Sequence, residues 1–163
     1  MEAENAWLSY AKYNKLPLHI FRLTGIYGPE RNPLERIQSG KKYSIYKEGQ
    51  MFSRVHVDDI VSILLASIKT PNPLSIYNVA DDEPAASHEV DAYAASLLKQ
   101  VALPLISFEE ASLSPKEQEF YLSNRRVSNE KIKRELNIVL RYPSFREGQS
   151  KIWSDDFEQN NRN

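Results

Sequence analysis

The chain has 163 residues, a length typical of one domain, and 41% of them are hydrophobic. Its formal net charge of −1 argues against a broad basic surface for nucleic acid. It contains no cysteine, which excludes disulfides, thiolate catalysis and cysteine-based zinc sites. No apolar run approaches the ~20 residues that span a bilayer, and the first residues are acidic where a signal peptide would be basic. We therefore expect a cytoplasmic protein.

The first third of the chain predicts a helix, a strand and a turn. Apolar residues at helical spacing predict a helix over residues 1–14, which Pro17 ends. This helix has no N-cap residue, so we expect part of the protein to precede it. Residues 18–23 are typical of a strand buried on both faces, as in a parallel sheet, and residues 24–29 form a turn with two glycines.

The middle of the chain alternates short strands and helices. Residues 33–38 predict a short helix, and residues 43–46 and 51–57 predict strands. Asp58 or Asp59 is then expected to cap a helix over residues 60–69, which is apolar nearly all round and therefore expected to be buried. A second buried strand is predicted over residues 75–79.

Serine residues that can act as N-caps predict the starts of the remaining helices, at Ser87, Ser114, Ser128 and Ser144. Glutamate follows Ser114 and Ser144 after three residues, which completes a capping box at each. The helix after Ser87 is expected to present an apolar face made of Val90, Ala94, Leu97 and Val101. The order of elements is β-α-β-α with a helical cap, an α/β class, in one domain over residues 1–152 with a polar tail over residues 153–163.

Five segments, in this order and spacing, resemble the extended short-chain dehydrogenase/reductase superfamily. They are LPLHIFR (16–22), IYGP (26–29), RVHVDDI (54–60), IYNVADDEP (76–84) and KIKREL (131–136). The chain is most similar to an atypical branch of NAD-dependent epimerase/dehydratase proteins, which are nucleoside-diphosphate-sugar epimerase-like. The resemblance covers residues 2–152. It implies the C-terminal portion of a Rossmann-like, doubly wound parallel sheet with a small, mostly helical substrate lobe.

The resemblance also implies roles for particular residues. The loop facing the nicotinamide would supply cofactor-binding residues, namely Leu23, Thr24, Gly25 and Tyr27. The substrate region would supply substrate-binding residues, namely Arg54, His56, Asn78 and Tyr121. In complete relatives the N-terminal helix helps to form a dimer interface, so Trp7 and Tyr10 are expected to face a partner.

The parts that do the chemistry in that family are not in this sequence. A dinucleotide pyrophosphate needs a glycine-rich loop that opens a helix, whereas Gly25-x-x-Gly28 is followed by Pro29 and reads as a tight turn. The catalytic Tyr-x-x-x-Lys would lie before Met1. A Tyr-x-x-x-Lys spacing at Tyr43–Lys47 comes after the first strand and reads as an exposed strand edge. We assign no catalytic residue, and expect NAD or NADP in the complete protein and none on this chain alone.

Two departures argue against a sugar-nucleotide substrate. Nucleotide-sugar members often carry asparagine at the position of Gly25 and arginine at the position of Phe52. Arg54 either replaces that arginine as an anion contact or faces solvent. The three histidines share no metal-ligand spacing. Asp58 and Asp59 are better explained as helix caps than as a paired-carboxylate site, and residues 81–83 as a solvated turn.

Three functional hypotheses follow. In the first, the chain is the substrate-side half of an NAD(P)-dependent oxidoreductase or epimerase-like protein, inactive alone. Without the first half, an apolar sheet edge is exposed, so stability depends on an N-terminal half supplied in trans or on self-association. In the second, the chain is a non-catalytic small-molecule or protein-binding module with a pocket near Tyr27, Arg54, Asn78 and Tyr121. In the third, it is a non-functional remnant of a split gene.

Overall fold

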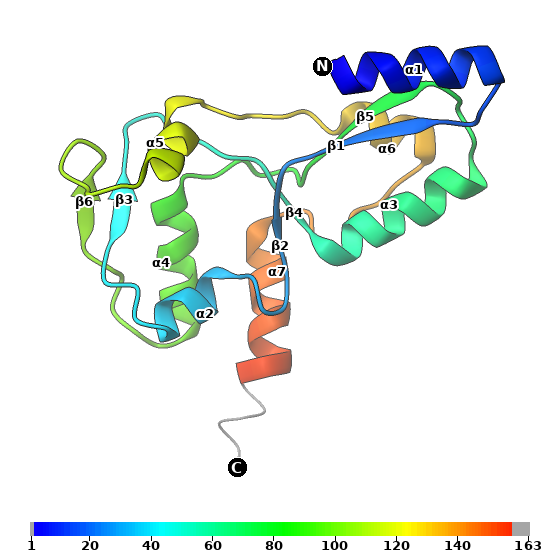
Figure 1. The fold of residues 1–163 in the computed structure, drawn as a ribbon. Coiled ribbons are helices and arrows are strands. Elements are labelled where there is room, and N and C mark those ends of the chain that lie inside the picture. The colour runs from blue at the N-terminus through cyan, green and yellow to red at the C-terminus, as the bar shows by residue number, and fades with distance from the viewer. Residues whose placement is uncertain (1, 158–163) are drawn as a thin grey trace.

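The computed structural model describes residues 2–157 and has an α/β fold built on short parallel strands (Figure 1). The strand pairs are β1 (His19–Leu23) with β5 (Ser75–Val79), β2 (Gly25–Tyr27) with β4 (Arg54–His56), and β3 (Ser44–Tyr46) with β6 (Leu105–Ser107). Partners in a parallel pair cannot be joined by a tight turn, so other elements cross over between them. The predicted α/β class with parallel strands is confirmed.

One lobe of the molecule is built on the β1–β5 pair, which runs through the upper right of Figure 1. Its helices are α1 (Glu2–Asn14), α3 (Val57–Lys69) and α6 (Glu130–Leu136). Alternate residues of β5, Tyr77 and Val79, point into a core that also contains Ile63 of α3 and Ile132 of α6. The period-2 alternation of a strand therefore meets one face of each helix.

Helix α1 has the predicted extent but only a small buried face. Ala11 is its one buried residue in the described chain, and Glu4 forms an ion pair with Arg22 of β1 at 2.6 Å. Trp7, Tyr10 and Tyr13 are exposed. Spaced three residues apart, they form an aromatic stripe on one side of the helix.

Helix α3 differs from the prediction at its start. Its N-cap is His56, whose Nδ1 accepts a hydrogen bond from the backbone N–H of Asp58 at 3.2 Å. The predicted caps, Asp58 and Asp59, instead lie inside the first turn. Because no loop separates β4 from the helix, the last residue of the strand, His56, occupies the N-cap position.

The predicted burial of α3 is also wrong. The helix packs one face against the core and leaves a stripe of large apolar side chains exposed, namely Val57, Val61, Leu64, Leu65 and Ile68. Ile68 alone is 75% exposed. Strand β1 likewise is only half-buried, because β5 is its single strand partner in the described chain. Both elements are rich in apolar residues, yet the 156 described residues leave much of this apolar surface exposed.

The second lobe is built on the β3–β6 pair, on the left of Figure 1. It carries α2 (Pro33–Gln38), α4 (Ser87–Leu97) and α5 (Pro115–Leu122). Leu34 and Ile37 of α2 pack against Ala94 of α4. Strand β6 was not predicted, because three residues between loops carry too short a pattern. The predicted membership of Val101 in the apolar face of α4 is wrong, since the helix ends earlier and Val101 is 91% exposed.

Helix α7 (Phe145–Ile152) lies between the lobes and packs on β4 and α4. It continues into a π-helical turn, η1 (Trp153–Phe157), so the predicted polar tail begins as helix, and its residues 158–163 lie outside the described residues. The capping boxes at Ser114 and Ser144 are confirmed. The other two predicted caps are off by one residue, because Ala86 and Asn129 occupy the N-cap positions.

Strands β2 and β4 form the middle of the molecule and differ in length from the predictions. The turn predicted over residues 24–29 contains β2, and the strand predicted over residues 51–57 is only the three residues of β4. Phe52 instead makes isolated bridges to Ala85 and Arg125. Among residues 2–157, no helix is long and apolar enough to cross a membrane.

Candidate functional site

An open cavity of about 1240 Å³ lies between the lobes, beside the carboxyl ends of β1 and β5. Its wall includes seven of the eight residues predicted to bind cofactor or substrate: Leu23, Thr24, Gly25, Tyr27, Arg54, Asn78 and Tyr121. His56 is the eighth and is not in the wall. Residues predicted from segments far apart in the sequence are thus brought to one hollow. Whether they bind a ligand there remains a prediction.

The predicted nicotinamide loop forms one side of the cavity. Leu23 is 44% exposed, which is unusual for a leucine at the end of a strand. The hydroxyl of Thr24 donates to the carbonyl of Val79 at 2.9 Å, and the N–H of Gly25 donates to the carbonyl of Ser53 at 3.2 Å. These two bonds hold the loop against β5 and the approach to β4, and leave the apolar side of Leu23 open.

Tyr27 belongs to this wall, but its hydroxyl is engaged in the core. The hydroxyl donates to the carbonyl of Ser144 at 3.3 Å, and the ring contacts His56 edge-on. Burial raises the pKa of Tyr27, and the nearby carboxylates of Asp81 and Asp59 raise it further. A neutral, buried phenol tied to a carbonyl is suited to shape the cavity rather than to exchange protons.

Arg54 enters the cavity from β4 and is held by backbone. Its Nη1 donates to the carbonyls of Phe52 and Ala85, both at 2.8 Å. Burial lowers the pKa of Arg54, opposed by the charges of Asp81 and Asp91. The sequence left two possibilities for Arg54, an anion contact or a side chain that faces bulk solvent. The second does not fit, because Arg54 is half-buried and lines a cavity.

Asp81 lies buried near Arg54, behind the cavity wall, and not in a solvated turn as the sequence predicts. It is 2% exposed, and its carboxylate oxygens have no hydrogen-bond partner among residues 2–157. Burial raises its pKa to about 7, with the charge of Arg54 opposing the change. Asp82 and Glu83 do lie at the surface, where they pair with Lys133 at 2.5 Å and Arg146 at 2.9 Å. Three adjacent acids gave no sequence signal that one turns inward.

The far wall of the cavity comes from the second lobe. Tyr121 is buried there beside the stacked rings of Phe52 and Phe120, whose centroids are 4.0 Å apart. Burial raises the pKa of Tyr121. Asn78 faces the cavity from the opposite side as an exposed residue of β5.

The Tyr-x-x-x-Lys spacing at Tyr43–Lys47 does not form a converging pair. Tyr43 lines the cavity, but Lys47 does not, and its Nζ donates to the carbonyl of Tyr121 at 2.6 Å and lies over the ring of Phe108. The prediction of an exposed strand edge holds in part: among the described residues β3 pairs only with β6, and Tyr46 is exposed, whereas Ser44 is buried.

A second buried acid, Asp91 on α4, was also missed. Its Oδ2 accepts from Nζ of Lys41 and from Oγ of Ser44, both at 2.6 Å. It lies next to Val90, and a carboxylate beside an apolar helix face was the available signal. This arrangement fixes α4 against β3 and uses the charge of Lys41.

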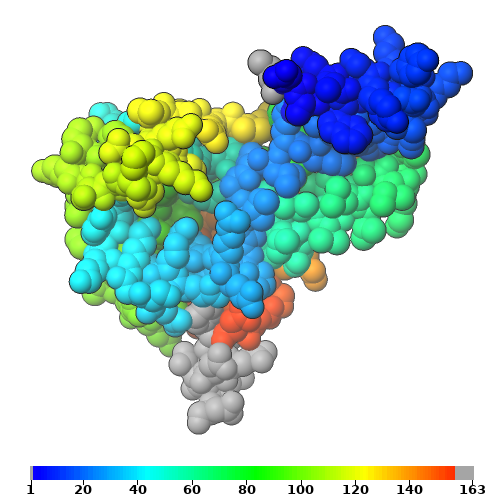
Figure 2. All heavy atoms as spheres, in the orientation of Figure 1, coloured from blue at the N-terminus to red at the C-terminus, as the bar shows by residue number. Residues whose placement is uncertain are grey.

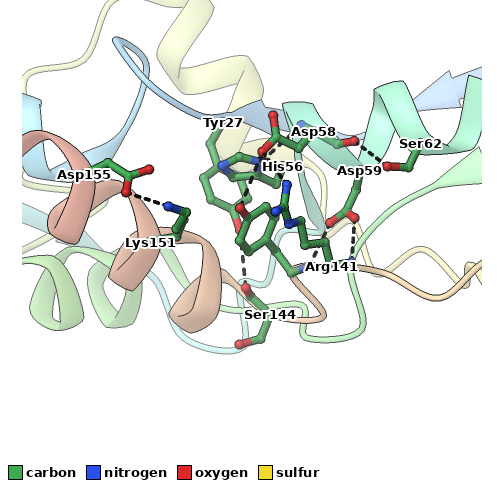
Figure 3. A network of polar contacts seen from close by, with 10 residues as sticks. Tyr27, His56, Asp58, Asp59, Ser62, Arg141, Ser144, Lys151 and Asp155 are labelled. Atoms are coloured by element: carbon green, nitrogen blue, oxygen red, sulfur yellow. Dashed lines mark hydrogen bonds and ion pairs between the residues drawn. The ribbon is translucent and has the colours of Figure 1, made fainter.

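The histidine and the paired aspartates after β4 form a structural network (Figure 3). The two oxygens of Asp59 accept from the backbone N–H groups of Arg141 at 2.7 Å and Tyr142 at 3.0 Å. Burial lowers the pKa of His56, its Nδ1 accepts the cap hydrogen bond, and its buried Nε2 has no hydrogen-bond partner among the described residues. His56 does not line the cavity, and its contact with a substrate stays a prediction.

His19 and Gly28, two further candidates from the sequence, make structural contacts. His19 accepts a hydrogen bond at Nε2 from the N–H of Asn72 at 2.8 Å. Within the described part of the chain, no group of three histidine, aspartate or glutamate side chains could hold a metal ion. A β-carbon on Gly28 would lie 2.7 Å from Cγ1 of Val57, so this glycine serves close packing rather than an open phosphate cradle. The turn from Gly25 to Gly28 therefore does not have the geometry of a pyrophosphate-binding loop.

Comparison with solved structures decides the fold. A conserved protein of unknown function from Silicibacter pomeroyi is 44% identical to this chain, with a TM-score of 0.88 over 94% of this chain and 53% of that one. UDP-glucose 4-epimerase of Thermotoga maritima, solved with UDP-glucose, is 17% identical, with a TM-score of 0.76 over 98% and 52%. The dTDP-glucose 4,6-dehydratase of Bacillus anthracis, solved with NAD, is 21% identical, with a TM-score of 0.68 over 93% and 49%. This chain has the fold of the C-terminal half of a Rossmann-like epimerase.

The chain thus spans about half the length of the solved structures that it matches. No protein-family model and no curated protein sequence matches it. The expected epimerase/dehydratase-like fold is confirmed, and the expected C-terminal half fits the coverage.

Proposed function

We propose that this chain is the substrate-side half of an NAD(P)-dependent epimerase- or dehydratase-like oxidoreductase, and that it works in the cytoplasm together with a second polypeptide. That polypeptide would supply the glycine-rich loop and the Tyr-x-x-x-Lys pair. The observation that carries the proposal is the cavity at the carboxyl ends of β1 and β5. In open α/β sheets, ligands bind outside the carboxyl ends of the parallel strands.

In this proposal the two walls of the cavity have different tasks. The apolar surface of Leu23 and the anchored Thr24–Gly25 backbone would meet the nicotinamide end of the cofactor. Arg54, Asn78 and Tyr121 would surround the substrate. NAD or NADP supplies hydride transfer when bound, and the contribution of this chain is to orient the substrate and exclude water.

The second polypeptide has a surface to occupy. The residues of α3 and β1 lie in the same lobe (Figure 2). Helix α3 exposes its apolar stripe, and the second edge of β1 has no strand partner in residues 2–157. Such an edge beside an apolar helix face is a template for strand pairing. We take the missing half to cover both, because the matched structures have about as many residues again as this chain covers.

The test uses this full chain with the part of the Silicibacter pomeroyi protein that the chain does not cover. Each polypeptide alone, and their mixture, is titrated with NAD and with NADP while the melting temperature is measured. A ligand that binds only the folded state must raise that temperature. We expect a rise for the mixture alone, with co-elution of the two polypeptides at one-to-one stoichiometry.

The other outcomes separate the alternatives. A cofactor-dependent rise with this chain alone would overturn the requirement for a second half. Cooperative unfolding of this chain alone, with no cofactor effect and no association in the mixture, would favour a non-catalytic binding module or a remnant. Homodimer formation without association in the mixture would assign the exposed surface to a second copy.

A further inference from the structure

The charges of the cavity wall are one-sided. Cationic side chains in the wall outnumber acidic ones by seven to three. Asp91 and Lys41 pair within the wall, Arg22 pairs with Glu4 outside it, and Glu117 accepts from Ser114, so five cations, among them Arg54, have no acidic partner within 3.5 Å in the described residues. A wall of one sign in a concave surface concentrates ligands of the opposite charge.

Arg54 is a cation of this wall that the backbone holds in position. Both hydrogen bonds of Nη1 go to carbonyl oxygens, so the guanidinium is oriented without loss of its charge. No carboxylate oxygen of the described residues lies within 4.0 Å of it. A guanidinium has five N–H groups. The three on Nε and Nη2 have no hydrogen-bond partner in the part of the chain that the structure describes.

The buried carboxyl group of Asp81 lies near Arg54 but does not line the cavity. When ionised, Asp81 favours the charged form of the guanidinium, and it does not occupy the N–H groups of Nε and Nη2. Planar pairs of N–H groups match the oxygens of a carboxylate or a phosphate and bind them by two parallel hydrogen bonds. We propose that the cavity binds a small polar substrate that carries a carboxylate or phosphate group, and that Nε and Nη2 of Arg54 hold this group.

This inference rests on the proposed function, since it takes the cavity for the substrate site, and it adds the chemical class of the substrate. It also explains how an anion is bound when the position often held by arginine in nucleotide-sugar enzymes is Phe52, which stacks on Phe120. A nucleotide is not required by this arrangement. In this proposal, Arg54 recognises only the anionic group of the ligand.

The test compares three probes that share one sugar skeleton and differ in charge: D-glucose, D-gluconate and D-glucose 6-phosphate. The full chain, labelled with ¹⁵N, is titrated at constant ionic strength, with chloride as the balancing anion because bulk salt screens charges. The Nε–Hε resonance of Arg54 is assigned by its loss in Arg54→Lys. We expect saturable shifts of this resonance with one or both anions and none with glucose.

Arg54→Lys keeps the positive charge but loses the planar pair of donors, and we expect it to weaken binding of that anion at least about tenfold. Arg134→Lys is the matched control, because Arg134 lies on the exposed surface of α6 and does not line the cavity. It should bind as the unaltered chain does. Should Arg54→Lys fail to fold, the Arg54 resonance is assigned by through-bond correlation to its backbone in a ¹³C,¹⁵N-labelled chain, and the titration of the unaltered chain then decides by itself.

Three results would overturn the assignment: equal shifts with glucose, equal shifts at the Nε–Hε resonance of Arg134, or no shift of the Arg54 resonance with either anion. A response to gluconate only or to glucose 6-phosphate only would identify the group as carboxylate or phosphate. The titration needs neither cofactor nor a second polypeptide. Anion binding without a reconstituted cofactor site would therefore sink the proposed function alone, and the reverse result would sink the anion assignment alone.

Discussion

Gly148 of α7 lies directly against the ring of Tyr27. A β-carbon placed on Gly148 would be 2.1 Å from the hydroxyl oxygen of Tyr27 and 2.7 Å from two of its ring carbons. The phenol thus reaches past α7 to the carbonyl of Ser144 through a gap that only glycine leaves. One wall of the cavity depends on this absence of a side chain.

Gly148→Ala should therefore destabilise the chain. Alanine normally favours a helix interior over glycine by about 1 kcal/mol, but here the methyl group overlaps a buried ring. Overpacking of this kind costs roughly 1–3 kcal/mol. We expect a lower urea midpoint with an unchanged m-value. In a Tyr27→Ala background the same substitution should be neutral or stabilising, and a loss of equal size in both backgrounds would contradict the steric explanation.

Asp59 fastens α3 to the segment before α7, and its neighbour Asp58 does not. Asp59 is 1% exposed, and both oxygens accept backbone N–H groups. Removing them leaves two donors without partners, at a cost of about 1–3 kcal/mol for each buried group. We expect Asp59→Ala to lower the free energy of unfolding by at least about 2 kcal/mol. Asp58→Ala serves as the control.

The Asp58 side chain is half-exposed, and its bond from the hydroxyl of Tyr142 is long, at 3.4 Å. Its removal should cost less than about 1 kcal/mol, the range of a first-turn charge at a helix N-terminus. Chemical unfolding of both variants measures the difference. Similar losses in the two would show that Asp59 acts as an ordinary first-turn charge and not as a buried clamp.

The pair Asp58 and Asp59 shows what sequence could and could not predict. Adjacent acids before an apolar helix correctly indicated a structural role, because local patterns report local structure. Which of them turns inward depends on residues 141–142, more than 80 positions away, and no local pattern contains that information.

Burial was predicted least well, and the reason is the same. The apolar composition of α3 and β1 predicted that both would be buried on all sides, whereas the described residues cover only one side of each. The extents of α1 and α2 and both capping boxes were confirmed, since their signals are local, whereas α3 begins earlier and α4 ends earlier than predicted. The ordered motifs led to residues that do line the cavity. The burial of Asp81 was not predicted, because its neighbours at the surface carry the same charge.

Asp81 gives the chain a pH-dependent stability with a definite sign. Burial raises its pKa from 3.8 to about 7, so the folded chain holds the proton over a range in which the unfolded chain releases it. Stability is therefore full below pH 3.8 as far as this group is concerned, and falls as the pH rises towards 7. A shift of this size corresponds to up to about 4 kcal/mol.

Asp81→Asn resembles the protonated form and should remove this dependence. We expect the free energy of unfolding of the variant, relative to the unaltered chain, to rise between pH 5 and pH 7.5 by about 3 kcal/mol. Urea unfolding across that range is the measurement. Asp82→Asn is the control, because Asp82 is exposed and pairs with Lys133. A constant difference between Asp81→Asn and the unaltered chain at all pH values would mean that Asp81 is ionised in the fold.

The exposed stripe of α3 allows the association with a second polypeptide to be tested without unfolding the chain. Leu65 and Ile68 are 53% and 75% exposed, so changing both to lysine should alter stability by no more than about 0.5 kcal/mol each. If a second polypeptide covers this stripe, the same two charges become buried without partners, which is costly. We expect Leu65→Lys with Ile68→Lys to abolish co-elution with the complementary half and the cofactor-dependent rise in melting temperature.

Val101→Lys with Leu122→Lys is the matched control for this pair. Val101 and Leu122 are 91% and 74% exposed and lie in the second lobe, after α4 and at the end of α5, so the control adds the same charge to apolar, accessible positions outside the lobe of α3. It should leave both association and cofactor response intact. Equal loss in the two double variants would trace the effect to net charge, and equal retention would place the contact on another surface of the chain.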